Sequence, residues 1–261
     1  MSANGIPPDL RTALVAAAEC GTLLVSSDYD GCISPLVSRP EDAVPNPASI
    51  AAIEAAAALP RTYAAVVSGR ELAVLTELSG LGTPVSLVGS HGSEFDTGFA
   101  VEVTDAHRAL LARLIDELRS IAGRFPGTMV ETKPASTVLH VRNASAQDAD
   151  AALDAARSGP AGWTGVQVTE GKSVIELAVI ETSKGHAIDA LRAKFGADSV
   201  IYLGDDVTDE KAFAHLRAGD VGIKVGDGDT VAAYRITDTD DVATVLEFVA
   251  ARRQTFLAGG T

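Results

Sequence analysis

The chain has 261 residues, of which 46% are hydrophobic and 21% charged, so it has enough apolar content to bury a sizeable core. Its 35 acidic and 21 basic residues give a net charge of −14. That charge argues against nucleic-acid partners and anionic membrane surfaces, because both would repel it. Only Cys20 and Cys32 are present, too few for a disulfide framework or a cysteine-rich zinc site.

No targeting signal is visible in the sequence. The segment from Met1 to Arg11 has no basic stretch followed by an apolar one. No run of about 18 apolar residues, the length that spans a bilayer, follows it. We therefore expect a cytoplasmic protein.

Short apolar runs alternate with helical segments over the first hundred residues. Strands are predicted at residues 22–27, 63–67 and 85–88, and helices at 47–59 and 71–78. Strands separated by helices are typical of right-handed βαβ units and a parallel sheet. In such sheets the loops after the carboxyl ends of the strands carry the functional site.

The pattern changes after about Phe99. A helix followed by two adjacent strands is predicted twice, with the helices at residues 105–122 and 146–157. The strand pairs are expected at 128–133 with 136–142, and at 165–170 with 173–180. Adjacent alternating strands favour an antiparallel sheet with helices on one face.

The βαβ rhythm resumes after Ser183. A helix is predicted at residues 184–195, an acidic loop at 204–210 and a last helix at 242–253. Strands are predicted at 200–203, 221–225 and 234–237. The sequence thus predicts an α/β domain made of residues 1–101 and 182–261, with an α+β insertion over residues 102–181.

Four polar clusters follow predicted strands or open predicted helices. Asp28 and Asp30 flank Tyr29 at the end of the first strand, where paired carboxylates must bind a cation or share a proton. Alone, this pair would more simply be an acidic turn. However, Ser68 and Lys184 could hold phosphoryl oxygens. A second carboxylate cluster could complete a shell of oxygen ligands around Mg²⁺; it comprises Asp205, Asp206 and Asp209.

The order of these motifs resembles that of the haloacid dehalogenase (HAD) superfamily of phosphotransferases. Within that superfamily, the segments 28–31, 67–70, 90–94, 170–176 and 204–210 look like those of the trehalose-6-phosphate phosphatase family. The resemblance spans nearly the whole chain. It implies a Rossmann-like HAD core with an inserted cap.

The resemblance also implies a Mg²⁺-dependent phosphoryl transfer in two steps. Asp28 would attack phosphorus and become an aspartyl phosphate, and Asp30 would act as general acid and then as general base. Asp28, the backbone carbonyl of Asp30, and Asp205 would bind Mg²⁺, with Asp206 and Asp209 as ligands or as support. Ser68 and Lys184 would bind the transferring phosphoryl group.

A second group of residues is expected to bind the sugar phosphate. Gly69, Arg70 and His91 follow strands of the α/β domain, whereas the inserted strands supply Lys133, Arg142, Lys172 and Glu176. Lys172 and Glu176 are four residues apart, so an extended strand would point both away from the apolar Ile175 and Leu177. We expect this polar sheet face to close over the phosphoryl site.

Two alternatives remain open at this point. The chain could be a phosphatase for another sugar phosphate, of the sucrose or glycosylglycerate type. It could also be a non-catalytic sugar-phosphate sensor that partners the synthase of trehalose 6-phosphate. We expect the synthase of trehalose 6-phosphate as a partner, whether the chain is a phosphatase or a sensor.

Overall fold

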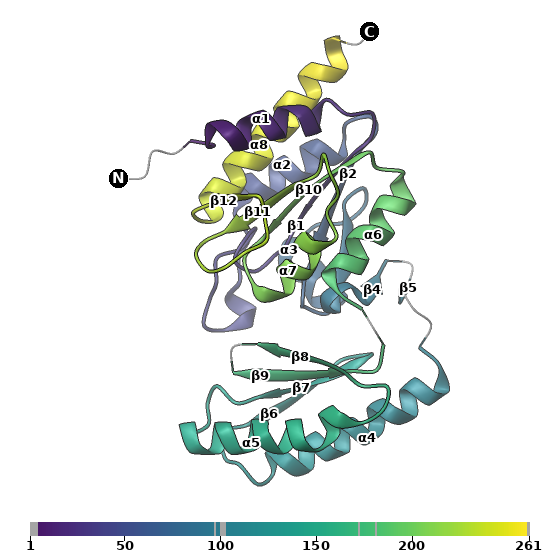
Figure 1. The fold of residues 1–261 in the computed structure, drawn as a ribbon, viewed down its shortest axis with the longest axis vertical. Helices are drawn as coiled ribbons and strands as arrows, with labels where there is room; N and C mark the ends of the chain where they lie inside the picture. Colours follow the sequence, from purple (N-terminus) through teal and green to yellow (C-terminus); the bar gives the residue numbers. More distant parts are fainter. Residues whose placement is uncertain (1–4, 97, 100–102, 172, 181, 260–261) are drawn as a thin grey trace. The chain divides into compact units, whose positions relative to one another are not determined.

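Figure 1 shows a computed structural model of the chain, which describes residues 5–96, 98–99, 103–171, 173–180 and 182–259. The chain divides into two compact units. The first comprises Met1–Ala100 and Thr182–Thr261, and the second comprises Val101–Glu181. Within the described residues, no helix combines the length and the apolar character that a membrane span needs.

The first unit contains an eight-stranded sheet in the order β12-β11-β10-β1-β2-β3-β4-β5. The strands from β12 to β3 are parallel, and β4 and β5 extend the sheet in antiparallel fashion. The bounds are β1 Leu23–Ser27, β2 Thr62–Val67, β3 Ser86–Gly89, β4 Glu94–Phe95, β5 Gly98–Phe99, β10 Ser199–Gly204, β11 Val221–Val225 and β12 Tyr234–Ile236. β1 lies in the middle and is buried along its whole length, Ser26 and Ser27 included, as expected for a strand of a parallel sheet that is covered on both faces.

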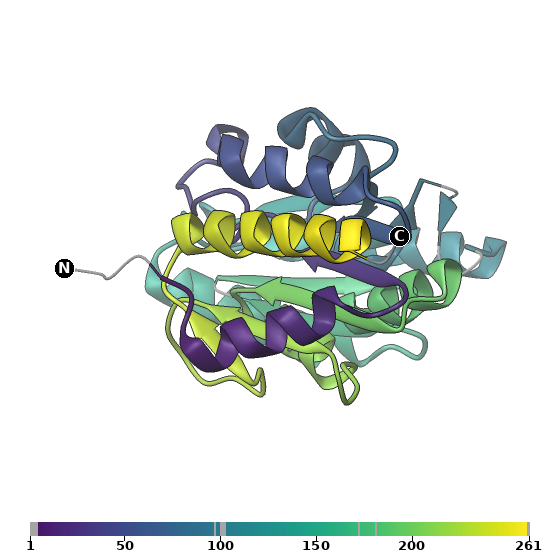
Figure 2. The same ribbon diagram turned by 90° about the horizontal axis from the view of Figure 1, so that it is seen from above.

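Helices pack on both faces of this sheet. One core cluster joins the sheet to α1, α2, α3 and α8, and another joins it to α6 and α7. These helices are α1 Pro8–Ala18, α2 Pro47–Ala57, α3 Leu72–Ser79, α6 Lys184–Phe195, α7 Val207–Ala214 and α8 Thr239–Gly259. Figure 2 shows α8 lying between α1 and α2.

The parallel sheet and the predicted α6 are confirmed, but the prediction of a loop over residues 204–210 is wrong. α7 begins at Val207, because Asp206 caps it and the Asp209 side chain completes a capping box. Such reciprocal hydrogen bonds satisfy the free N–H groups at a helix start. α1 was not predicted, and α8 begins earlier and ends later than the predicted range of 242–253.

The second unit is a four-stranded antiparallel sheet in the order β6-β7-β9-β8. Its helices, α4 Asp105–Ala122 and α5 Ala146–Ser158, share one core with the sheet, to which Ile175 and Leu177 belong. The strands are β6 Met129–Thr132, β7 Ser136–His140, β8 Gln167–Gly171 and β9 Val174–Ala178. The predicted repeat of helix, strand and strand is confirmed.

Two details of the predicted polar sheet face are wrong. β7 ends at His140, so Arg142 lies in the following turn and is exposed rather than on a strand face. Ser173 has a φ of 66°, which interrupts the strand alternation on which the pairing of Lys172 with Glu176 was based. Lys172 itself lies outside the described residues.

One buried cation ties three segments of the first unit together. Arg253 of α8 is fully buried. Its guanidinium donates to Thr62 Oγ1 and to the carbonyl oxygens of Ala18, Cys20, Gly21 and Arg61. These carbonyls belong to the segments before β1 and β2, so Arg253 fixes where both strands begin.

We predict that Arg253→Met lowers the free energy of unfolding by about 2–4 kcal/mol, because it leaves buried carbonyl groups without donors. Denaturant unfolding of the purified protein measures the change. Arg252→Met is the matched control: Arg252 is part-exposed and bonds only to Glu19 among the described residues. Its loss should cost less than about 1 kcal/mol, and equal losses for the two variants would contradict the role given to Arg253.

Candidate active site

Asp28 stands at the carboxyl end of β1, the central strand, and is buried. Its backbone N–H donates to Leu203 O of β10 at 2.8 Å, which continues the sheet one residue further. The side chain accepts from the Tyr29 N–H at 2.6 Å through Oδ1. Oδ2 lies 2.6 Å from Lys184 Nζ. The predicted nucleophile is therefore fixed in orientation by one amide and one ammonium.

Lys184 is the first residue of α6 and is buried. Its Nζ contacts Asp28 Oδ2 at 2.6 Å and Asp209 Oδ1 at 2.8 Å. Burial alone would lower the pKa of the ammonium, but the two carboxylates outweigh it and raise that pKa. Lys184 is thus a permanent cation at the end of β1.

Four donors surround the Asp209 carboxylate. Oδ1 accepts from Lys184 Nζ at 2.8 Å and from Tyr202 Oη at 2.6 Å. Oδ2 accepts from the N–H groups of Asp205 and Asp206, both at 3.0 Å. Burial works against ionisation here, yet Lys184 and these hydrogen bonds lower the pKa of Asp209. Because a carboxylate has about four lone-pair positions, this side chain is saturated by protein donors.

Asp205 completes a cluster of carboxylates. Its side chain, with those of Asp28 and Asp209, offers oxygens that all lie within 4.8 Å of one another. Burial and the neighbouring Asp209 raise the pKa of Asp205 to about 7. Burial also raises the pKa of Asp28, helped by Asp209 and Asp205 and opposed by Lys184. Such mutual repulsion is relieved by a cation, and the all-oxygen donors suit a hard one.

Two neighbouring positions show how closely these loops approach. A Cβ at Gly31, whose φ is 78°, would lie 2.1 Å from Asp205 Oδ2. Asp206, in contrast, is exposed, and its carboxylate accepts from Val207 N at 2.7 Å as the cap of α7. Asp205 therefore turns toward the end of β1, whereas Asp206 is used in starting the helix.

Ser68, Gly69 and His91 lie together beyond β2 and β3. Ser68 is buried, and its Oγ accepts from Arg70 N at 3.1 Å. The His91 N–H donates to Ser68 O at 2.9 Å. A Cβ at Gly69 would lie only 2.4 Å from His91 Cε1, so the absence of a side chain at Gly69 lets the ring approach. These three predicted residues are brought together.

Asp30 and Arg70 form an ion pair that sequence analysis did not predict. Arg70 Nε and Nη2 donate to Asp30 Oδ2 and Oδ1 at 2.7 and 2.6 Å. The two residues are 40 positions apart and come from the loops after β1 and β2. The predicted acid–base residue is therefore held by a residue that was predicted to bind substrate.

Three further residues support the site and were missed. Tyr202 lies inside the apolar run of β10, and its hydroxyl donates to Asp209. Lys224, buried on β11, donates to the carbonyl oxygen of Asp205. Glu94 accepts from Leu72 N at 2.8 Å and Ser90 Oγ at 3.1 Å. Of these three residues, only Glu94 lies in a segment that resembles the family, the motif at residues 90–94.

The second unit brings together two of its four predicted substrate-binding residues. Glu176 Oε1 of β9 accepts from Ser136 Oγ at 2.6 Å and contacts Lys133 Nζ at 3.4 Å. Glu131 Oε2 contacts His140 Nε2 at 2.7 Å on the adjoining strands β6 and β7. Arg142 is not among the residues that contact this cluster through a described hydrogen bond or ion pair.

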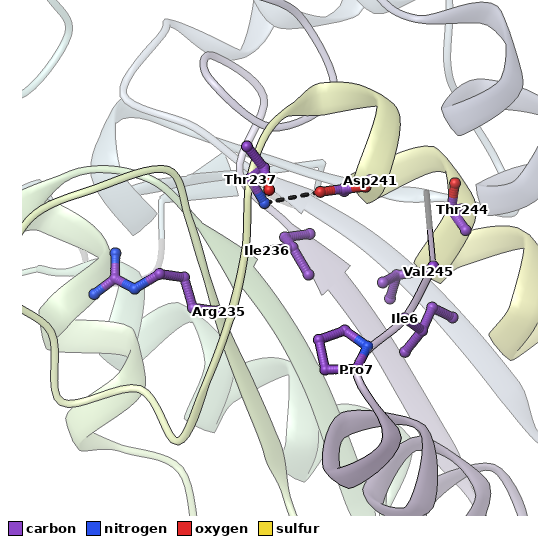
Figure 3. Close-up of a pocket in the computed structure, with 9 residues that line it drawn as sticks. Ile6, Pro7, Arg235, Ile236, Thr237, Asp241, Thr244 and Val245 are labelled. Carbon is purple, nitrogen blue, oxygen red and sulfur yellow. Dashed lines mark hydrogen bonds between the residues drawn. The ribbon is translucent and has the colours of Figure 1, made fainter. Parts of the chain in front are cut away.

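A cavity elsewhere in the first unit has a different lining. Figure 3 shows a pocket of about 220 Å³ between the start of α1 and the start of α8, lined by Ile6, Pro7, Ile236 and Val245 among others. Of the residues predicted for the site, none is among those that line it. The candidate active site is therefore defined by its side chains and not by this pocket.

Comparison with known proteins gives consistent results. Residues 26–239 match the family described as trehalose-phosphatase. The "Trehalose-6-phosphate phosphatase" of Escherichia coli (strain K12) is 30% identical over 85% of this chain and 84% of its own length. The "Trehalose-phosphate phosphatase" of Mycobacterium marinum is 35% identical over 83% of this chain, which spans 58% of that relative.

The fold is shared with a solved structure. The C-terminal domain of the C. albicans trehalose-6-phosphate phosphatase superposes with a TM-score of 0.79, covering 96% of this chain and 99% of that domain at 21% identity. That identity supports the fold alone. The family match covers Asp28, Ser68 and Asp205, which follow strands, and Lys184 at the start of α6, and the chain belongs to the trehalose-phosphatase family.

Proposed function

We propose that this protein hydrolyses trehalose 6-phosphate to trehalose and phosphate through an aspartyl phosphate on Asp28. The observation that carries the proposal is the Asp28 carboxylate, fixed at the end of β1 by Lys184 and adjacent to Asp205. A carboxylate in this setting is an oriented nucleophile beside a permanent positive charge. Membership of the trehalose-phosphatase family supports the choice of substrate.

The reaction divides into two displacements. In the first, an Asp28 oxygen attacks phosphorus, the bond from phosphorus to the sugar oxygen breaks, and Asp30 gives that oxygen a proton. In the second, Asp30 takes a proton from a water that attacks the same phosphorus and releases Asp28. Lys184 and Ser68 hold phosphoryl oxygens in both steps, so the negative charge that is transferred remains compensated.

The carboxylate cluster fits a Mg²⁺ ion. Asp28 and Asp205 would hold it through side-chain oxygens and Asp30 through its backbone carbonyl. When bound, the ion supplies positive charge that stabilises the phosphoryl group during transfer. Asp209, with its oxygens already occupied by four donors, would support Asp205 and Lys184 rather than bind metal. Asp206 would act by capping α7.

Sugar recognition is assigned to Glu176 and Lys133 of the second unit and to the loops beside Ser68. Glu176 and Lys133 offer a charged acceptor and a charged donor, which suit the hydroxyl groups of a disaccharide. His91 and Gly69 remain predicted contacts, as do Arg142 and Lys172. The synthase of trehalose 6-phosphate remains a predicted partner.

The first prediction from the proposed function concerns the nucleophile. Asp28→Asn removes the charged attacking oxygen, so turnover of trehalose 6-phosphate should fall by several orders of magnitude while the fold is retained. Phosphate release measures turnover, and circular dichroism measures the fold. Asp105→Asn, an exposed carboxylate at the start of α4, should remain active. Substantial turnover by Asp28→Asn would rule out Asp28 as the nucleophile.

The second prediction concerns the metal, whose binding can be measured as a change in stability, without turnover. Mg²⁺ at 100 times its dissociation constant should raise the free energy of unfolding by about 2.7 kcal/mol, because it binds only the folded protein. Asp205→Asn should abolish this stabilisation, and Asp206→Asn should largely keep it, since Asn also caps helices well. Chelation should stop hydrolysis and Mg²⁺ should restore it, whereas Ca²⁺ should bind without supporting turnover. Full activity in excess chelator would refute the site.

The third separates sugar recognition from phosphoryl transfer. Glu176→Gln should lower kcat/KM for trehalose 6-phosphate at least tenfold, about 1.4 kcal/mol, because a charged acceptor is lost. Hydrolysis of a small aryl phosphate should hardly change. Glu170→Gln is the control, since Glu170 of β8 pairs with Arg157 of α5 instead. If both substrates suffered equally from Glu176→Gln, the residue would serve folding or chemistry rather than recognition.

A further inference from the structure

The guanidinium group of Arg70 is directed at Asp30 by several independent contacts. Its Nε and Nη2 donate to the two carboxylate oxygens of Asp30, and Nη1 donates to Pro40 O at 3.0 Å. The guanidinium carbon lies 5.7 Å from the ring centroid of Tyr29, whose hydroxyl is held by Ala43 O at 2.8 Å. The Arg70 side chain is only 12% exposed. Its orientation is therefore set by the protein.

The backbone of Arg70 is fixed as firmly. Its N–H donates to Ser68 Oγ at 3.1 Å, and its carbonyl oxygen accepts from Ser90 N at 2.7 Å. Arg70 thus connects the loop that carries Ser68, a predicted ligand of the phosphoryl group, to the carboxylate of Asp30. Moving Asp30 relative to Ser68 would require breaking this connection.

The Asp30 carboxylate keeps capacity for a further partner. Two of its roughly four acceptor positions are filled by Arg70, and its side chain is 30% exposed. A planar two-point contact to guanidinium fixes the plane of a carboxylate, which a single hydrogen bond does not. The remaining lone pairs then point in defined directions.

We propose that Arg70 is a positioning residue: it orients the Asp30 carboxylate for proton transfer and does not itself bind the substrate. The inference rests on the proposed function, in which Asp30 is the general acid and base. It assigns to Arg70 a role in the rate of turnover and not in affinity. A substrate-binding Arg70, the alternative, would act mainly through KM.

A double-mutant cycle tests the proposal. In wild-type background, Arg70→Met should lower kcat for trehalose 6-phosphate at least about tenfold and change KM by less than about twofold. In an Asp30→Asn background, where no acid–base carboxylate remains to be oriented, the same substitution should change kcat by less than about twofold. Arg70→Lys should recover part of kcat, since it keeps the charge but not the planar contact.

The controls separate orientation from general damage. Arg39→Met removes an exposed arginine that makes the same two-point contact, to Asp42, and should leave kcat and KM unchanged. The cycle is repeated with p-nitrophenyl phosphate, so it does not depend on sugar specificity. If Arg70→Met does not fold, as judged by thermal unfolding, Arg70→Lys takes its place in the cycle.

The outcomes distinguish this inference from the proposed function. A rise in KM with unchanged kcat, losses that multiply in the double variant, or no loss at all would each overturn the positioning role while wild-type turnover and the Asp28→Asn loss stand. A wild-type protein that hydrolyses neither substrate would overturn the proposed function and this inference with it. Loss of kcat confined to the background that retains Asp30 supports the proposal.

Discussion

A buried ammonium group shared by two carboxylates organises the candidate active site. Lys184 at the start of α6 contacts Asp28 at the end of β1 and Asp209 in α7, so three elements distant in sequence meet at one charge. Removing the shared ammonium would leave two buried carboxylates without their counter-charge, at a cost of about 3–5 kcal/mol. The loops that carry the predicted catalytic residues are therefore held in place by the same charges that the proposed reaction would use.

This arrangement places the carboxylates of Asp28 and Asp30, which are separated only by Tyr29, in different environments. Asp28 is buried beside Lys184 and two other acids, and burial raises its pKa. Asp30 is more exposed and is held by Arg70. Distinct surroundings are the means by which one site gives similar side chains separate roles. Here the difference arises because β1 ends at Ser27 and the chain turns at Gly31, where a positive φ allows close approach to Asp205.

Much of the fold and of the candidate site could be predicted from the sequence, for identifiable reasons. The α4 and α6 ranges are correct because Thr104 and Ser183 cap them and the apolar spacing is helical. The ends of β1, β2 and β10, which precede Asp28, Ser68 and Asp205, follow from short and largely apolar runs. What could not be predicted involves side chains whose partners are remote. The pairing of Arg70 with Asp30 and the contact of Lys224 with Asp205 depend on the order of the strands in the sheet. Asp206 and Asp209, which form the capping box of α7, were predicted as metal ligands or support because the sequence shows only their carboxylates.

The double pairing of Lys184 also separates folding from catalysis. Asp209 draws on four donors and neutralises the ammonium by itself, so the scaffold around Lys184 does not depend on Asp28 carrying a charge. In the proposed mechanism, a chain that lost only the Asp28 carboxylate would keep the end of β1, Ser68 and Lys184 in place. Loss of that one carboxylate would therefore abolish the proposed hydrolysis without any change to the core, while Ser68 and Lys184 would still be presented to a phosphorylated sugar.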